Sequence, residues 1–447
     1  MKKRYCFLLF LLVSCRVFAQ NTTDSTDGKL NLVQCIRYAL RNQPVYRQAY
    51  IDQQIAEKDI QIRFADWFPQ ISVGNTYEHF LKKSVSAFPN FSNPAAGRQY
   101  VATGVNNNNT LGLSATQSIF SNTLRIAGKT AGYYRSQARQ NTEQVRISLV
   151  VDVSKAFYDL LLNRQQLAVL DEDISRLGTN TRISKALYQN GTNDPIDYDQ
   201  SIIALNNSVS QRFTAAESIK SKFTYLRQLM GYPQVRPLDL QYDSLTLTRE
   251  INVDTPAVAQ PYRRIEYQQL QTTVALLKEN YSYYKYNFLP TVSAFGNFNL
   301  VNQNDNFSKL FDRNFPNSVV GLTISIPIFQ GNKRIDNMRR AELTIRRSAQ
   351  DQIELTNNIQ TQYSQAIGTY KSYRRQYELT AQNVEIAKHV YNVVSLQYKQ
   401  GIKPYLNLIQ AESDLRTSQL NYLNSLFELL SSKLDVEQAL GTVGTQP

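Results

Sequence analysis

Residues 359–404 read IQTQYSQAIGTYKSYRRQYELTAQNVEIAKHVYNVVSLQYKQGIKP. Within this stretch, apolar or small side chains recur in steps that alternate between four and three residues, which is the spacing of a coiled-coil seam. The helix has to end at Gly401, because glycine tolerates a left-handed cap and Pro404 suits the first turn of a following helix. We therefore predict a helical hairpin from Gly331 to about Leu440. Its seam is formed by Ile359, Tyr363, Ala366, Tyr370, Tyr373, Tyr377, Thr380, Val384, Ala387, Tyr391, Val394 and Tyr398.

A second long hairpin is predicted upstream. A period of 3.6 runs from Leu124 to Tyr188, stops at Gly191 and resumes from Ile196 to Met230. At a rise of 1.5 Å per residue, roughly 65 residues of helix are about 100 Å long. Globular helices average about 11–12 residues, so the fold is predicted to be organised around two oversized hairpins.

Short alternating segments precede both hairpins. In four of them, apolar residues alternate with polar or small ones, which is the pattern of β-strands. The first two are separated by a loop rich in proline, glycine and asparagine. Each pair of strands follows a helical segment, Leu30–Phe64 or Pro261–Tyr286. The predicted strands are Gln70–Phe80, Thr110–Phe120, Thr291–Leu300 and Val319–Phe329.

The predicted elements occur twice in the same order. Phe120 and Phe329 are 209 residues apart, and Gly191 and Gly401 are 210 residues apart. The motifs Trp67-Phe68-Pro69 and Phe288-Leu289-Pro290 each stand before the first strand of a pair. We therefore predict one domain, residues 20–447, made of two repeats at 30–231 and 257–441. An irregular linker at 232–256 joins them.

The N-terminus has the pattern of a secretory signal peptide. It reads MKKRYCFLLFLLVSCRVFAQ, with a basic start, an apolar run and a small residue at Ala19. Cleavage after Ala19 would remove residues 1–19. The run Leu12-Val13-Ser14-Cys15 also resembles a bacterial lipobox, so lipidation of Cys15 is an alternative. No later run approaches 18 apolar residues, and no membrane-spanning helix is predicted.

The predicted strands have the length and pattern of membrane strands. About ten residues cross a bilayer when the strand is tilted by roughly 45°, and one apolar face suits a lipid-facing wall with a wet interior. Four strands cannot close around a pore, and open edges are not tolerated in lipid, so the chain must assemble. Two copies would give eight strands with a filled interior, and three would give twelve strands around a lumen. Aromatic residues at the strand–helix junctions suit an interfacial belt, although core packing fits their rings equally: Trp67, Phe68, Phe120, Phe288 and Phe329. The junctions themselves are predicted at Trp67, Pro69, Phe120, Pro290, Pro327 and Phe329.

Several motifs, taken in order, resemble those of the TolC-like outer-membrane efflux and secretion channels. They include the opening helix LNLVQCIRYALRNQP and the Ile326-Pro327-Ile328-Phe329 segment before a long helix. The tip sequences Tyr188-Gln-Asn-Gly191 and Tyr398-Lys-Gln-Gly401 complete the resemblance, which covers nearly the whole mature chain. It implies a homotrimer, in which a twelve-stranded β-barrel in the outer membrane continues into a coiled-coil α-helical barrel across the periplasm. It also implies two partners, a periplasmic adaptor (membrane fusion) protein and an inner-membrane transporter, which dock at the helical tips.

The resemblance further implies a periplasmic aperture where the tip helices narrow. Carried over position by position, it places five residues near the constriction and makes Gly191 and Gly401 the tip turns where the adaptor docks. Where two carboxylates can follow the second tip in the family, this chain has Asn407 and Gln410. A ring of carboxylates selects cations, so we expect weak cation selectivity here, although both amides also suit a solvated helix. The predicted aperture residues are Asp197, Tyr398, Lys403, Asn407 and Gln410.

Nothing in the sequence supports an enzyme or a cofactor. His79 and His389 have no partner at ligand spacing, and there is no glycine-rich phosphate loop, metal cluster or nucleophile motif. Lys and Arg outnumber Asp and Glu by 49 to 36, but the excess is spread along helices and does not predict nucleic-acid binding. Asp171-Glu172-Asp173 is expected to be a solvated charge run.

The sequence is thus interpreted as a passive exit duct in the outer membrane. It would serve a tripartite efflux or type I secretion system, with the energy supplied at the inner membrane. The alternative is a soluble periplasmic coiled-coil adaptor or scaffold, in which the four alternating segments would be soluble strands.

Overall fold

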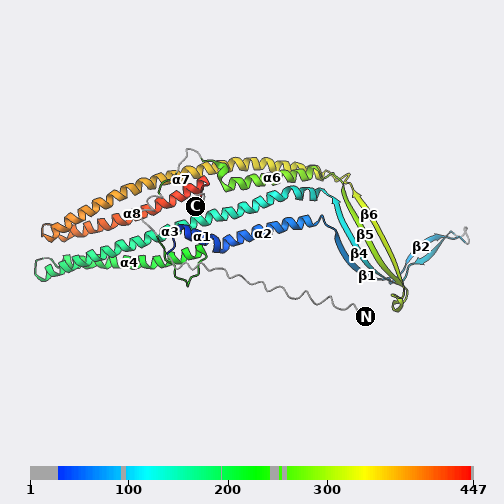
Figure 1. The fold of residues 1–447 in the computed structure, drawn as a ribbon, viewed down its shortest axis with the longest axis horizontal. Coiled ribbons are helices and arrows are strands. Elements are labelled where there is room, and N and C mark those ends of the chain that lie inside the picture. Colours follow the sequence, from blue (N-terminus) through cyan, green and yellow to red (C-terminus); the bar gives the residue numbers. More distant parts are fainter. Residues whose placement is uncertain (1–28, 92–96, 193, 242–250, 254–258, 444–447) are drawn as a thin grey trace, which may run out of the picture.

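The protein is a long molecule with a β-sheet at one end and two helical tips at the other (Figure 1). The computed structural model describes residues 29–91, 97–192, 194–241, 251–253 and 259–443. The predicted signal peptide, its cleavage site and the lipobox lie outside the described residues, as does part of the predicted linker. No helix among the residues that the structure describes is both long and apolar enough to cross a membrane.

The first half contains the predicted elements in the predicted order. The predicted opening helix is divided at Pro44, which occupies the first turn of its second part, where its missing N–H costs nothing. The elements are α1 (Leu32–Asn42), α2 (Pro44–Ala65), β1 (Gln70–His79), β4 (Asn107–Phe120), α3 (Asn122–Gln189) and α4 (Pro195–Met230).

The second half follows the same order. Its last strand ends at Ser325, whereas the alternation had predicted Phe329, because Pro327 has no N–H to donate to a sheet. The elements are η2 (Pro261–Arg263), α6 (Ile265–Lys285), β5 (Thr291–Asn304), η3 (Phe307–Lys309), β6 (Asn314–Ser325), α7 (Lys333–Lys399) and α8 (Tyr405–Leu440).

The main sheet has the strand order β1-β4-β5-β6, and all neighbours are antiparallel. The pairing of β4 with β5 joins the two halves, so β1 and β6 are the edges and have no second partner among the described residues. The register brings the apolar positions of all four strands onto one face, where they are exposed or half-exposed. This apolar sheet face consists of Ile71, Val73, Leu111, Leu113, Phe298, Leu300, Val320, Leu322 and Ile324.

The opposite face of the sheet carries small and polar side chains. The Ser72 and Ser114 hydroxyls are 2.8 Å apart, and the Asn299 amide donates to Asn317 at 3.0 Å. Gly321 lies under the ring of Phe295, and a Cβ at this position would stand 2.7 Å from the ring. The two-faced pattern expected from the sequence is therefore present in the sheet, with four apolar exceptions on the polar face: Phe295, Val301, Phe315 and Val319.

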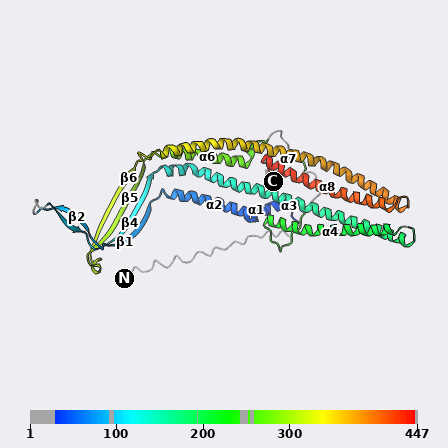
Figure 2. The same cartoon turned by 180° about the vertical axis from the view of Figure 1, so that it is seen from behind.

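The loop predicted between the first two strands contains a small ribbon. Strands β2 (Ser84–Pro89) and β3 (Arg98–Thr103) pair antiparallel and project beyond the main sheet, away from the helices (Figures 1 and 2). At its root, Lys83 forms a 2.6 Å ion pair with Asp305, which also accepts a hydrogen bond from the Asn106 N–H at 3.1 Å. The loop prediction was wrong here because the alternation of each strand covers only six residues, between segments rich in turn-forming residues.

The hydrophobic core lies midway along the helical part, where α1 packs against α3 and α4. The linker residues Leu238 and Leu240 join this core, and a backbone bridge pairs Leu30 with Leu240. In the second hairpin every predicted seam residue is buried or half-buried, and Tyr377 stacks on Tyr422 at a centroid distance of 5.4 Å. The predicted coiled-coil seam is confirmed. Fully enclosed core residues include Cys35, Ala39, Val153, Leu160, Leu161, Leu226, Met230, Leu429, Leu430 and Val436.

Candidate functional site

The two tip turns have the same backbone geometry. Gly191 and Gly401 adopt φ values of 72° and 74°, a left-handed conformation that favours glycine. Each N–H bonds the carbonyl three residues back, Tyr188 at 3.0 Å and Tyr398 at 2.9 Å. Both were predicted as turn glycines, and both are. A role in adaptor docking is a separate prediction that the geometry of one chain does not test.

Residues after each turn start the return helices. Pro195 is the first residue of α4, and the Asp194 carboxylate caps the helix by accepting from the Ile196 N–H at 2.9 Å. Pro404 precedes α8 in the equivalent way, in an extended conformation. The sharp, proline-stiffened turns place the two hairpins side by side at one end of the molecule (Figure 1).

Tyr398 joins the two hairpins near their tips. Its side chain is only 6 % exposed, and its hydroxyl lies 3.2 Å from that of Ser184 on α3. Its ring also makes an edge contact with Tyr405, at a centroid distance of 5.7 Å. Burial and the nearby charge of Asp197 raise the pKa of Tyr398 above its ordinary value, so the phenol is neutral and can donate.

The five predicted aperture residues separate into two groups. Asp197 and Tyr398, from different halves, come together between the hairpins. Lys403, Asn407 and Gln410 lie exposed on the second hairpin, and the Gln410 amide donates to Asp414 at 2.9 Å. Tyr398 therefore contacts the first hairpin within one chain, while the other three are available to a lumen or to a neighbour.

A cluster of buried charges lies about 22 Å from the first tip, counting 15 residues of helix from Gly191. We call Asp173, Arg176, Glu412 and Arg416 the charge cluster. The Arg176 Nε donates to Glu412 at 2.6 Å, and Arg416 lies 3.2 Å from Asp173. The expectation that Asp173 belongs to a solvated run was wrong, because its side chain is completely buried. A sequence signal did exist: Asp173 occupies the apolar spacing formed by Leu170, Asp173, Leu177, Asn180 and Ser184, all of them buried.

Burial sets the protonation behaviour of Glu412. Desolvation is the largest influence, and it raises the pKa of this carboxyl above its ordinary value of 4.5. The bonds from Arg176 and Tyr391 oppose the shift without cancelling it. Glu412 is thus a buried group whose charge responds to pH at the contact between the hairpins.

The predicted belt residues lie where the sheet meets the helices. Trp67, Phe68, Phe288 and Phe329 are exposed, and Trp67 stacks on Phe64 at 5.9 Å. The four junctions, α2–β1, β4–α3, α6–β5 and β6–α7, lie together at the inner end of the sheet (Figure 1). Exposed aromatic residues at the boundary between sheet and helices suit an interfacial belt, which stays a prediction.

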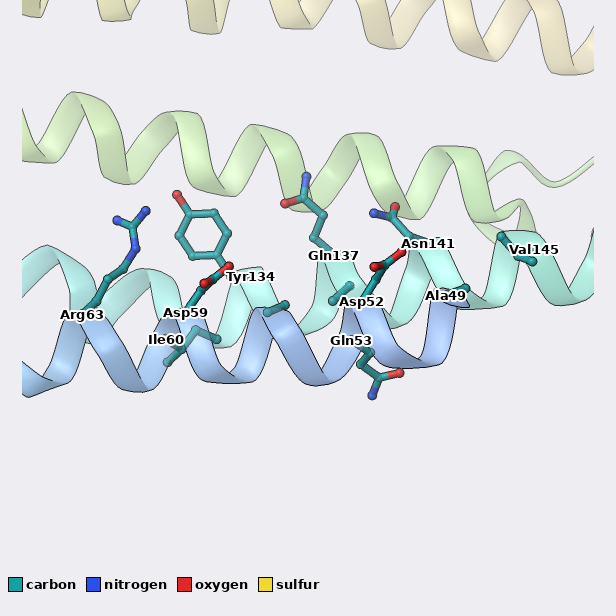
Figure 3. A pocket seen from close by; sticks show the side chains of 12 residues that line it. Ala49, Asp52, Gln53, Asp59, Ile60, Arg63, Tyr134, Gln137, Asn141 and Val145 are labelled. Atoms are coloured by element: carbon teal, nitrogen blue, oxygen red, sulfur yellow. The ribbon is translucent and has the colours of Figure 1, made fainter. Parts of the chain in front are cut away.

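The helical wall below the sheet carries a groove of about 350 Å³ between α2 and α3, with a mostly apolar lining. Asp52 and Asp59 of α2 face Gln137, Asn141 and Tyr134 of α3 (Figure 3). The groove is open and its carboxylates are exposed.

The two histidines stand apart from any ligand set. His79 contacts the Asn107 side chain at 2.8 Å, and His389 is exposed on α7. No group of three or more candidate metal ligands occurs in the described part of the chain.

Comparison with known proteins then decides the family. The model of the outer membrane efflux protein family matches residues 35–232 and 263–442. The chain belongs to this family. It is therefore an outer-membrane channel that serves as the exit duct of an efflux system in a Gram-negative bacterium, with a helical extension into the periplasm. The alternative of a soluble adaptor or scaffold is wrong.

Relatives and solved structures of this family span most of the chain. The outer membrane protein TolC of Escherichia coli is 21 % identical over 93 % of this chain and 83 % of its own length. The toluene efflux pump outer membrane protein TtgC of Pseudomonas putida is 22 % identical over 92 % of this chain and 82 % of its own. The solved structure of CusC has a TM-score of 0.72 at 17 % identity, covering 92 % of this chain and 91 % of that one. The open state of the Neisseria gonorrhoeae MtrE channel has a TM-score of 0.68 at 15 % identity, covering 92 % and 88 %.

Proposed function

We propose that three copies of this efflux protein form one duct. The single observation that carries the proposal is the four-stranded sheet, which has a continuous apolar face and two edges without a partner strand in the described part of the chain. In lipid, every backbone donor and acceptor has to be paired, so β1 of one copy has to meet β6 of the next. Three copies supply twelve strands, enough to leave a water-filled lumen.

The helices then continue the barrel as a tunnel. Their two repeats, 30–231 and 257–441, each supply one long hairpin, and the described linker residues Leu238 and Leu240 pack at the middle. The tips at Gly191 and Gly401 point away from the sheet and form the periplasmic end. A periplasmic adaptor docks there and connects the duct to an inner-membrane transporter, which supplies the energy.

The tip is also the proposed gate. Asp197, Tyr398, Lys403, Asn407 and Gln410 lie within a few turns of it, and partners that bind the open arrangement better shift the hairpins apart. Relatives named for the efflux of toluene, of solvents and of antibiotics support small molecules as the transported class.

The apolar face provides the test. Val320 points to the apolar side of the edge strand β6, while its neighbour Val319 pairs with Asn297 on the polar side. Val320→Lys places a charge against lipid and should reduce recovery of trimer from outer membranes by at least tenfold. Val319→Lys should be recovered as a trimer at close to the normal level. Light scattering in detergent that gives the mass of one chain for the unaltered protein would contradict the proposal.

A further inference from the structure

The charge cluster connects the two hairpins through charged groups inside the protein. Arg176 and Asp173 belong to α3, while Glu412 and Arg416 belong to α8. Both close pairs cross between the hairpins, Arg176 with Glu412 at 2.6 Å and Arg416 with Asp173 at 3.2 Å. The four side chains carry two negative and two positive charges, so each pair and the cluster as a whole are neutral when all four are ionised.

The remaining two helices complete the cluster. The Ser208 hydroxyl of α4 donates to Asp173 at 2.5 Å. From α7, Tyr391 bonds Glu412, and its ring centroid lies 5.6 Å from the Arg176 guanidinium. All four helices of the two hairpins therefore meet at this point.

The cluster is buried more deeply than ion pairs on the surface. Asp173 and Glu412 are 0 % and 1 % exposed, and the two arginines are 21 % and 17 % exposed. Lys155–Asp435, a further pair between α3 and α8, is 33 % and 46 % exposed. Exposed pairs contribute little, whereas removing one partner from a buried pair leaves an uncompensated charge and is strongly destabilising.

Charged groups make this contact easier to open than an apolar one. When the hairpins separate, the carboxylates and guanidiniums regain the hydration that burial removed, which offsets much of the lost attraction. An apolar contact of the same area would lose its stabilisation with no such compensation. Asp173 Oδ1 and Arg176 Nη2 face each other at 3.6 Å, within ion-pair range but beyond hydrogen-bond distance, and neither has a hydrogen-bond partner in the described structure.

We propose that the charge cluster is a second contact that keeps the hairpins together, and that its strength sets how readily the gate opens. The proposal rests on the proposed role of the tips as a gate. The cluster acts through the helices on the Tyr398–Ser184 contact, eight residues further along α3, or about 12 Å. Arg176 and Glu412 are positioning residues in this scheme, with no contact to the transported molecule.

A charge reversal and its rescue test the proposal. Arg176→Glu adds a third carboxylate beside Asp173 and Glu412, and the full-length protein in planar bilayers should spend about five- to tenfold more time in the conducting state. Adding Glu412→Arg restores the opposite charges and should return the channel towards its original behaviour. Arg212→Glu is the matched control, because Arg212 pairs with Asp171 at the surface within one hairpin and should change gating little.

A second readout separates gating from folding and from the duct itself. Ser184 is completely buried between the hairpins, so Ser184→Cys should react with a maleimide only when they part. The background is low because the single cysteine described, Cys35, is also buried. In Arg176→Glu this labelling should be faster by a similar factor, measured on material recovered as trimer.

The outcomes distinguish the two proposals. A well-folded Arg176→Glu protein with unchanged conductance and labelling would overturn the charge-cluster proposal and leave the duct intact. A double variant that stays as open as Arg176→Glu alone would also overturn it. If no form of the protein conducts, including the unaltered one, the proposed duct fails, while the labelling result still decides the cluster.

Discussion

The Tyr398 hydroxyl lies 3.2 Å from the Ser184 hydroxyl, although 214 residues separate them in the chain. Ser184 belongs to the first half and Tyr398 to the second, and both side chains are buried. This contact is the last direct hydrogen bond between α3 and the second hairpin before the tips, among those that the structure describes.

Tyr398→Phe removes the hydroxyl that reaches Ser184. A neutral hydrogen bond contributes about 0.5–1.5 kcal/mol, so the open fraction should rise by about two- to tenfold in single-channel recordings. Tyr188→Phe is the control, because Tyr188 is exposed at the same tip and stacks on Tyr198 within one hairpin. Equal effects from the two substitutions would show that the Tyr398 hydroxyl does not hold the tips together.

Asn407→Asp combined with Gln410→Asp creates a carboxylate ring at the predicted aperture. Both side chains are exposed on α8, so they can face the lumen of an assembled duct. The preference for K⁺ over Cl⁻, read from reversal potentials in a salt gradient, should increase several-fold. Thr417→Asp, on the same helix but further from the tip, should have a smaller effect. An unchanged reversal potential in the double variant would mean that the constriction lies elsewhere.

The raised pKa of Glu412 predicts a pH dependence of opening. With the hairpins joined, as in this structure, Glu412 binds its proton more tightly than a hydrated carboxyl does, so protonation favours the joined hairpins. This stabilisation is complete below the ordinary pKa of 4.5 and is lost as the pH rises through the raised value. The open fraction should therefore increase with pH in this window.

Glu412→Gln removes the titrating group from that experiment. Asp173, Arg176 and Tyr391 still face the position, but the variant should lose the part of the pH response that Glu412 supplies. An identical pH profile for the variant and the unaltered protein would assign the response to other groups.

Gly321→Val tests the packing of the sheet. Its side chain would displace the Phe295 ring, because a Cβ at Gly321 would lie 2.7 Å from it. Overpacking of this kind costs about 1–3 kcal/mol, so the assembled protein should dissociate at a lower temperature on unboiled gels. Gly74→Val is the matched control, since no atom lies within 4 Å of a Cβ there. Equal heat resistance of the two variants would argue against the ring contact.

Local sequence patterns were sufficient for the hairpins and the main strands. The heptad steps from Ile359 to Tyr398, the glycine–proline turns and the alternation in β6 are all properties of neighbouring residues. The ribbon of β2 and β3 was missed because six alternating residues among prolines and asparagines carry too weak a signal. The end of β6 was placed too late because alternation continues through Ile326 and Ile328, whereas Pro327 cannot join a ladder.

The charge cluster was missed for a different reason. Whether Asp173 meets water or Arg416 depends on how α3 is rotated against α8, and the two residues are 243 positions apart in the chain. Local charge density does not contain that information. The seam position of Asp173 could have indicated burial, but it could not have named the partner. The partners of the predicted aperture residues could not be named from the sequence either, because Lys403, Asn407 and Gln410 acquire neighbours only on assembly.

The buried core near Leu160 and Leu161 is the point about which α3 can tilt. Val169 still packs against that core, and from there to the end of α3 at Gln189 the helix extends for about 30 Å. A tilt of roughly 10° about the core would displace the tip by about 5 Å, which is more than the length of a hydrogen bond. A small tilt of α3 at the core therefore produces a larger displacement at its tip, and the sheet at the far end does not have to move.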